Sequence, residues 1–324
     1  MMASTAGAGV RHAPLWVDVA ARVVRALPAG RYRAMNWVAR RSSGPFVAHM
    51  PRELGGLQFL CDLGDPLMRE VCLTGRYEPQ ETALLQRLLA QGMTTVDVGA
   101  NWGYFTLVAA HLVGTRGRVI SVEADPRAHH TLQWNISSNG LRSVRVVAAA
   151  AADQVGTLSF AAYGTDLDAS ANFGLVLTSS SGRAGRRFDV PARPLDQMLD
   201  EAQVERVDLL KMDIEGAEAR AIAGLARRLS AQLVDRIVLE LHPTYLREQG
   251  SSARAVIDRL SAYGYRAWQI DHSPRTHHRA ASGAFDAASL LTPFASDGHL
   301  GDWPHLLWAR NGLDALPAAR PGCL

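Results

Sequence analysis

The chain has 324 residues, of which 48% are hydrophobic and 20% are charged. This ordinary globular composition excludes a disordered, collagen-like or coiled-coil protein, and no apolar run approaches the ~18 residues that a membrane span needs. The net charge of +3, from 34 basic and 31 acidic residues, is too balanced to indicate nucleic acid as a partner. Three cysteines are too few for a disulfide framework, so we expect a reducing, cytoplasmic compartment.

The first 74 residues predict a helical extension that leads into the main domain. Trp16 to Arg41 has helical periodicity, which Pro28 and Gly30 interrupt. Its repeating apolar positions are Trp16, Val19, Ala20, Val23, Val24 and Leu27. The segment is also basic, through Arg22, Arg25, Arg31, Arg33, Arg40 and Arg41. We expect this helix to pack on its own domain, and peripheral contact with an anionic membrane surface is the second interpretation.

Strands and helices then alternate along a domain that we place at 75–315, before a tail at 316–324. Strands are predicted at 94–100, 118–124, 144–152, 207–214, 236–242, 265–271 and 305–310, with 157–163 as a further candidate. Helices are predicted at 81–91, 102–113, 126–139, 217–229 and 252–263. The alternation predicts an α/β fold with a mostly parallel sheet covered on both faces. Segments near 164–187 and 273–302 are expected as loop insertions, the first of them a lid.

A glycine-rich turn follows the first strand of this domain, in the stretch VDVGANWGYFT at 96–106. Ligands of open α/β sheets bind at the carboxyl ends of strands, and Gly99 and Gly103 suit unusual backbone angles there. Asn101 stands where a dinucleotide site has its second glycine, and Asp97 would repel a phosphate. The turn therefore favours a cationic or hydroxyl- and amine-bearing ligand. The alternative is a plain strand-to-helix turn.

Two acids follow the next strands in turn. Glu123 ends the second strand about 20–25 residues past the glycine turn, where a carboxylate accepts hydrogen bonds from a ribose diol. The alternative role, an N-cap of the following helix, suits Asp125 better. Asp153 ends the third strand, where it would accept an adenine amino group. An acid in a turn is common, so this signal is weak by itself.

Charged residues gather at the end of a later strand, in DLLKMDIEGAE at 208–218. Lys211, Asp213 and Glu215 share one side of an extended strand, and such charges are costly at the end of a buried strand unless they are paired or functional. Glu240 and His242 share a side at the end of the next strand. The alternative is a cluster that caps the following helix.

These segments together resemble the FkbM family of S-adenosylmethionine-dependent methyltransferases. The matching pieces are VDVGANWGYFT, VISVEADP, LLKMDIEGAE and ELH, in that order, and GRYEPQET at 75–82 resembles the family's lead-in. The resemblance implies a class I methyltransferase (Rossmann-like) fold, with a seven-stranded, mostly parallel sheet whose last strand is antiparallel. It also implies O-methylation of a hydroxyl on a sugar, glycolipid or natural product.

The resemblance assigns roles to residues of this chain. Glu123 would hold the ribose of S-adenosylmethionine and Asp153 its adenine, whereas the methionine end would lie on Asp97, Gly99, Asn101 and Gly103. Lys211, Asp213 and Glu215 would line the acceptor side. A hydroxyl acceptor benefits from a base, for which Asp213 is the first candidate and His242 the second. Asp213 and Glu215 can alternatively hold a divalent metal that acidifies the hydroxyl, and the sequence leaves the two open.

Two other functions compete on the same fold. An NAD-dependent oxidoreductase is disfavoured by the Gly99-x-Asn101-x-Gly103 turn. A non-catalytic interaction protein is disfavoured by the charged end of the strand at 207–214, since a scaffold has no need of three charges there. The partner that the resemblance implies is a small-molecule or saccharide acceptor.

Overall fold

The computed structural model describes residues 11–27, 30–41, 44–161, 176–177, 187–281, 287–294, 300–301 and 303–310. The chain divides into two compact units, and the second begins at Glu78. Among the described residues, no helix is both long and apolar enough to cross a membrane. The expected lid at 164–187 lies almost wholly outside the described residues.

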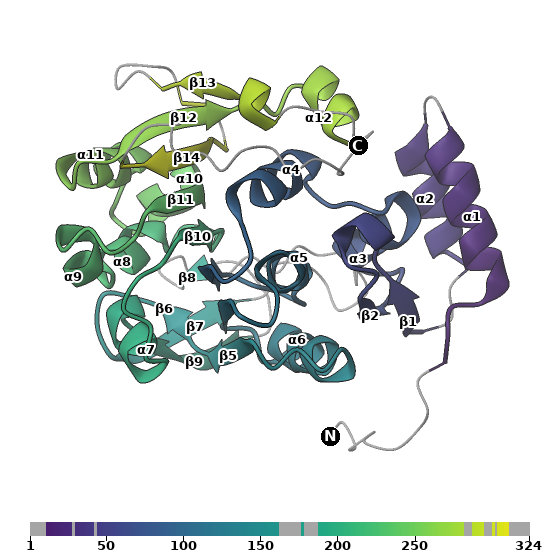
Figure 1. Cartoon of the computed structure of the whole chain (residues 1–324), viewed down its shortest axis with the longest axis horizontal. Coiled ribbons are helices and arrows are strands. Elements are labelled where there is room, and N and C mark those ends of the chain that lie inside the picture. The colour runs from purple at the N-terminus through teal and green to yellow at the C-terminus, as the bar shows by residue number, and fades with distance from the viewer. Residues whose placement is uncertain are drawn as a thin grey trace. The chain divides into compact units, whose positions relative to one another are not determined.

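The first unit contains three α-helices and a β-hairpin in its described part, drawn in purple and dark blue (Figure 1). Its elements are α1 (Leu15–Ala26), α2 (Arg31–Ala39), β1 (Phe46–His49), the 3₁₀ turn η1 (Arg52–Leu54), β2 (Gln58–Cys61) and α3 (Pro66–Thr74). The helix predicted across Trp16–Arg41 is divided in two, and Gly30 precedes α2 with a left-handed φ of 76°.

The buried face of α1 differs from the predicted one. Val17, Ala21 and Val24 are buried, whereas Trp16, Val19 and Val23 are exposed. The helix carries two apolar faces with the same spacing, and only the one that packs toward α3 enters the core of the unit. Of the three buried residues of α1, only Val24 was among the predicted apolar positions.

The second unit is built on a sheet of eight strands, not seven. Their order is β13-β12-β14-β11-β10-β3-β4-β5. Their bounds are β3 (Thr94–Val98), β4 (Arg118–Glu123), β5 (Val144–Ala148), β10 (Leu209–Met212), β11 (Arg236–Glu240), β12 (Arg266–Ile270), β13 (Leu291–Pro293) and β14 (His305–Ala309). β14 lies antiparallel between β11 and β12, as expected for a last strand. The additional strand, β13, pairs antiparallel with β12 and comes from the segment 273–302 that was expected as a loop.

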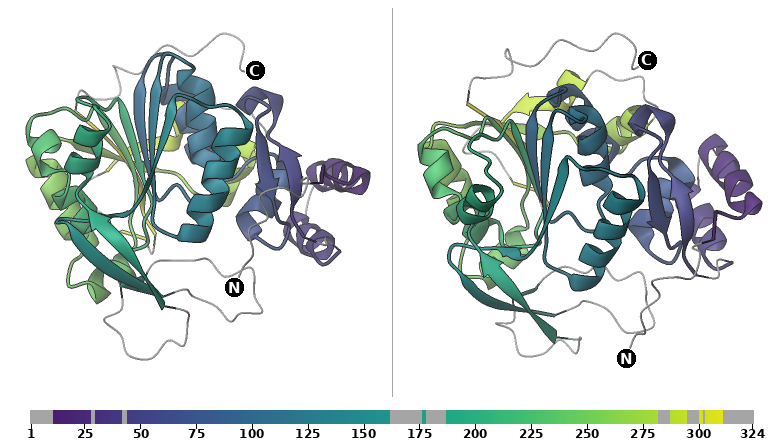
Figure 2. Two further views of the ribbon diagram at one scale, coloured as in Figure 1. Left: turned by 90° about the horizontal axis from the view of Figure 1, so that it is seen from below. Right: turned by 60° about the horizontal axis from the view of Figure 1, so that its bottom comes forward.

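Helices cover both faces of this sheet. Figure 2 shows α5 and α6 on one face and the green helices α7 to α11 on the other. The helices of the unit are α4 (Pro79–Leu88), α5 (Tyr104–Val113), α6 (Pro126–Ser138), α7 (Leu195–Glu201), α8 (Glu218–Ala223), α9 (Ala226–Ser230), α10 (Pro243–Glu248), α11 (Ala253–Ala262) and α12 (Pro274–Ala281), with the 3₁₀ turn η2 (Ala287–Leu290). The central parallel strands β3, β4, β10 and β11 are almost wholly buried, so the core of the unit lies around them.

The predicted strand 144–152 is broken at Ala149. β5 ends at Ala148, and Ala150–Ala151 forms β6 in a second sheet of order β6-β9-β7-β8. The other strands are β7 (Gly156–Ala161), β8 (Val176–Leu177) and β9 (Arg187–Arg193). The run of alanines carries no periodicity that could mark where one strand ends and the next begins.

Candidate active site

The glycine turn connects β3 to α5, and its residues adopt left-handed backbone angles. The φ values are 82° at Gly99, 51° at Asn101 and 101° at Gly103. A Cβ atom at Gly99 would lie 1.9 Å from the carbonyl oxygen of Asp213. The end of β10 therefore leaves no room for a side chain at Gly99. The approach of a ligand was expected to require this glycine, whereas in the structure the approach of the Asp213 backbone requires it.

Glu123 holds the glycine turn at the end of β4. Its Oε2 accepts a hydrogen bond of 2.6 Å from the amide of Asn101, and its Oε1 accepts one of 2.7 Å from the amide of Asp125. Burial raises the pKa of Glu123 to about 7, against the lowering effect of these amides. The N-cap of α6 is Asp125, whose Oδ1 accepts from the amide of Arg127. Glu123 is therefore not the helix cap.

Asp97 lies buried within β3, directly before the turn. Its Oδ2 accepts a hydrogen bond of 2.6 Å from Oγ1 of Thr106. Its Oδ1 is buried and has no hydrogen-bond partner among the described residues. Burial raises the pKa of Asp97, and Lys211 acts in the opposite direction. An unsatisfied buried carboxylate oxygen beside a turn suits a donor from a bound ligand.

Asp153 lies in the turn after β6, not at the end of β5. Its side chain is 43% exposed and lies 3.7 Å from Arg220. Its expected role toward adenine stays a prediction.

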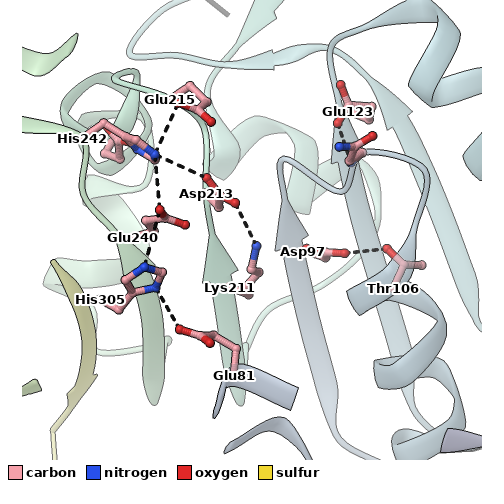
Figure 3. Close-up of polar contacts among 12 residues, drawn as sticks. Glu81, Asp97, Thr106, Glu123, Lys211, Asp213, Glu215, Glu240, His242 and His305 are labelled. Carbon is pink, nitrogen blue, oxygen red and sulfur yellow. Dashed lines mark hydrogen bonds and ion pairs between the residues drawn. The ribbon is translucent and has the colours of Figure 1, made fainter. Parts of the chain in front are cut away.

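Contrary to the prediction, the charged residues Lys211, Asp213 and Glu215 do not lie on one side of a single strand. Only Lys211 belongs to β10, and the other two follow it. β10 ends at Met212, and Glu215 has a left-handed φ of 51°. Nζ of Lys211 lies 3.4 Å from Oδ2 of Asp213. The acids converge on Nε2 of His242, which is 3.3 Å from Glu215 and 3.9 Å from Asp213 (Figure 3).

Two cations are held among these carboxylates. Burial alone would lower the pKa of His242, but hydrogen bonds to Glu218 and Glu240 and the charge of Glu215 raise it to about 11. Burial would likewise lower the pKa of Lys211, yet the nearby carboxylates, with Asp213 foremost, raise it. Burial and the charge of Glu240 raise the pKa of Asp213. His242 is therefore a proton donor in this arrangement.

Three further residues continue the cluster along the sheet edge, and the sequence reasoning missed them. Oε1 of Glu81 lies 2.8 Å from Nδ1 of His305 and 2.6 Å from Nε2 of His272. Nε2 of His305 lies 3.5 Å from Oε1 of Glu240, which contacts His242 at the same distance. One signal for His305 was available, because an antiparallel last strand begins where its parallel neighbours end. His272 directly follows the predicted strand 265–271, and Glu81 lies within the GRYEPQET segment, but neither position indicates by itself that the two side chains meet.

The strand order, with an antiparallel strand inserted near one edge, and the glycine turn with an acid on the next strand define a class I methyltransferase fold. The model of the methyltransferase FkbM domain matches residues 97–267, just over half of the chain. The chain therefore belongs to the FkbM family of methyltransferases.

Solved structures with similar folds are distant in sequence. A methyltransferase FkbM from Methylobacillus flagellatus KT is 15% identical, with a TM-score of 0.42, and the match covers 86% of this chain and 58% of that one. A putative rRNA methylase from Clostridium thermocellum is 11% identical, with a TM-score of 0.41, over 71% of this chain and 93% of that one. Fibrillarin from Aeropyrum pernix, solved with natively bound S-adenosyl-L-methionine, is 14% identical over 71% of this chain and 73% of that one, with a TM-score of 0.37.

Proposed function

We propose that this chain transfers the methyl group of S-adenosylmethionine to a hydroxyl of a sugar, glycolipid or natural product. The observation that carries the proposal is the direct hydrogen bond between the Glu123 carboxylate and the Asn101 amide, beside the carbonyl of Asp213 that packs on Gly99. This contact brings a cofactor-type turn and a charged cluster to the same edge of the sheet.

The residues at the turn fit S-adenosylmethionine. The partnerless Oδ1 of Asp97 suits the ammonium group of the methionine end, together with the backbone of Gly99, Asn101 and Gly103. Each oxygen of Glu123 accepts one amide and retains a lone pair for a ribose hydroxyl. Asp153 is our proposal for the adenine amino group.

Asp213 is the proposed base for the acceptor hydroxyl. When bound, S-adenosylmethionine supplies a methyl group already activated on a sulfonium centre, so the protein has to align the acceptor oxygen and remove its proton. Both ring nitrogens of His242 face carboxylates, Nδ1 toward Glu218 and Nε2 toward Glu215. Asp213 is therefore better placed than His242 to receive the proton, and Lys211 would stabilise the negative charge on the oxygen.

A metal-assisted route is the second candidate. Ligand atoms of Asp213, Glu215 and His242 lie within 4.8 Å of one another. A divalent ion there would acidify the hydroxyl without a protein base. In that case EDTA should abolish turnover and Mg²⁺ or Mn²⁺ should restore it, whereas a base mechanism should be insensitive to EDTA.

Titration calorimetry with S-adenosylhomocysteine and with NAD tests the class of enzyme. We expect binding of the first and none of the second, and the reverse would contradict the proposal. A mass-shift screen of glycosides and lipid-linked sugars, in which a product gains one methyl group, then tests the acceptor class. A chain that binds S-adenosylhomocysteine but methylates none of them would leave the cofactor site standing and remove the proposed acceptors.

A further inference from the structure

Beside the cluster around Asp213 lies a second group of side chains with metal-ligand chemistry, which we call the two-histidine cluster: Glu81, His272 and His305. Glu81 belongs to the first turn of α4, His272 follows β12, and His305 is the first residue of β14. One ligand atom from each of the three lies within 4.8 Å of the others. Three segments far apart in the chain thus direct nitrogen and oxygen ligands to one place.

The contacts within this cluster are unusual for a simple ion pair. Both histidines direct one nitrogen at the same oxygen, Oε1 of Glu81, at 2.6 Å and 2.8 Å. Their rings are stacked with centroids 3.7 Å apart. Glu81 is 1% exposed, and its Oε2 has no hydrogen-bond partner among the described residues.

The surroundings of His305 match those of a metal-binding histidine. A ligating imidazole ordinarily presents one nitrogen to the ion and the other to a carboxylate that fixes the ring. His305 directs Nδ1 into the cluster, while its Nε2 lies 3.5 Å from Oε1 of Glu240 (Figure 3). Glu240 is therefore the outer carboxylate of such an arrangement.

We propose that Glu81, His272 and His305 bind a divalent first-row transition-metal ion, with Zn²⁺ as the ion that two imidazoles and one carboxylate suit. Ligand distances of about 2 Å require the three atoms to separate by roughly half an ångström. The His272 side chain is 31% exposed and can make that adjustment. The ion would join α4 to β14 and, through Glu240, fix the position of His242.

Metal content and a spectroscopic signature test the site without an activity assay. The full chain, stripped with EDTA and dialysed, is titrated with ZnCl₂ by calorimetry and with CoCl₂ by visible absorption. We expect one ion per chain and Co²⁺ absorption bands typical of low coordination number. His305→Ala and Glu81→Gln should weaken binding by at least about 10-fold, because even the loss of an outer-shell partner costs that much. His130→Ala, on the exposed side of α6, should not change it.

Substitutions at Glu81 and His305 can prevent folding, so a third variant is made at the more exposed His272. His272→Asn should still fold and should also lose the Co²⁺ absorption. Absence of Zn²⁺ binding in a folded chain would overturn the site and leave a hydrogen-bonded histidine pair. If Asp213→Asn loses Zn²⁺ binding and His305→Ala retains it, the ion binds at the cluster around Asp213 and not at the two-histidine cluster. Calorimetry with S-adenosylhomocysteine on the same samples keeps this result separate from the proposed methyl transfer.

An independent observation concerns the first unit. The outer face of α1 carries Leu15, Val19 and Val23, which are 84%, 58% and 55% exposed. Spacing of four residues aligns them in one stripe, and Trp16 borders it. On α2, Tyr32 and Trp37 are 63% and 59% exposed. We call Leu15, Trp16, Val19 and Val23 the apolar face of α1, and Tyr32 and Trp37 are further exposed aromatic side chains on α2.

The charges around this face are almost all positive. Asp18 is the only acid in α1 and α2, while the exposed arginines include Arg22, Arg33 and Arg41. Exposed tryptophan and tyrosine beside arginine are typical of segments that lie in a membrane interface. We propose that the apolar face of α1, together with the exposed aromatic side chains of α2, docks on an anionic lipid bilayer, which would bring the enzyme to the proposed lipid-linked acceptor.

Sedimentation with vesicles tests this docking. The full chain should pellet with vesicles that contain phosphatidylglycerol and less with pure phosphatidylcholine, and added salt should weaken the binding. Val19→Glu with Val23→Glu should abolish it, whereas Val155→Glu, at a 67% exposed valine of the second unit, should not. Failure to pellet with either lipid would overturn the proposal. Self-association by light scattering that the same double variant removes would show instead that a second copy covers the face.

Discussion

Oε1 of Glu218 lies 2.8 Å from Nδ1 of His242, and Glu218 is completely buried. The same oxygen accepts a hydrogen bond of 3.0 Å from the amide of Gly216. Glu218 therefore fixes both the turn after β10 and the ring at the end of β11. His242 owes its orientation to a residue that would not itself contact a substrate.

Removing that positioning carboxylate should separate binding from turnover. In Glu218→Gln the amide can still accept from Gly216, but the negative charge that orients protonated His242 is lost. We expect a loss of about 1–3 kcal/mol in the free energy of unfolding, the range for a buried charged hydrogen bond. S-adenosylhomocysteine affinity should stay unchanged and kcat should fall. Urea unfolding, calorimetry and initial rates measure the three quantities, and an unchanged kcat would contradict the positioning role.

Asp213→Asn tests the proposed base. The amide keeps the size of the side chain but does not accept the proton, so turnover should fall by roughly 10²-fold or more while cofactor binding survives. A helix-capping role predicts a different result, a loss of about 1 kcal/mol in stability with nearly intact turnover. The geometry favours the base, because the Asp213 carboxylate lies 3.4 Å from Nζ of Lys211 and 3.9 Å from Nε2 of His242.

Glu123 makes the proposed cofactor affinity depend on pH. Its pKa of about 7 in the folded chain exceeds its ordinary value of 4.5, mainly through burial, with the charge of Asp125 acting in the same direction. Between pH 4.5 and about 7 the unfolded chain loses this proton while the folded carboxyl retains it, so stability falls as the pH rises through this range. The carboxylate is also the form that best accepts ribose hydroxyls, so S-adenosylhomocysteine affinity should rise with pH through about 7. Calorimetry should show a flat profile in Glu123→Gln, and the same slope in both proteins would contradict the assignment.

Gly92, which lies outside the glycine turn, has nearly the same backbone angle as Gly99 and provides a control for its substitution. The φ values are 82° at Gly99 and 86° at Gly92, but a Cβ at Gly92 would meet no atom within 4 Å, whereas one at Gly99 would lie 1.9 Å from the Asp213 oxygen. Gly92→Ala should therefore report the backbone penalty alone, about 1–2 kcal/mol. Gly99→Ala should add a steric cost of about 1–3 kcal/mol and weaken S-adenosylhomocysteine binding. If thermal unfolding shows equal stability for the two variants, the backbone at Asp213 can shift to make room for the Cβ atom, and the predicted steric cost is absent.

The positions of the glycine turn and of Glu123 could be predicted because their signals are local. The turn at Gly99 and the acid at Glu123 follow strands whose apolar runs are plain in the sequence, and adjacent parallel strands bring their ends together. The two-histidine cluster was missed because its members are far apart in the sequence, with 191 positions between Glu81 and His272. The outer face of α1 was misassigned for another reason. The helix has two apolar stripes with equivalent helical spacing, and only tertiary packing distinguishes them. The buried stripe is Val17, Ala21 and Val24, and the exposed one is Leu15, Val19 and Val23.

The antiparallel insertion of β14 between β11 and β12 has a consequence for how the protein matures during translation. The glycine turn and Glu123 leave the ribosome early and can form with the first parallel strands. His305 emerges well after Glu123 and the parallel strands, and only then can it meet Glu81 and Glu240. A nascent chain can therefore assemble its proposed cofactor-binding half well before the histidine-lined edge of the sheet is complete.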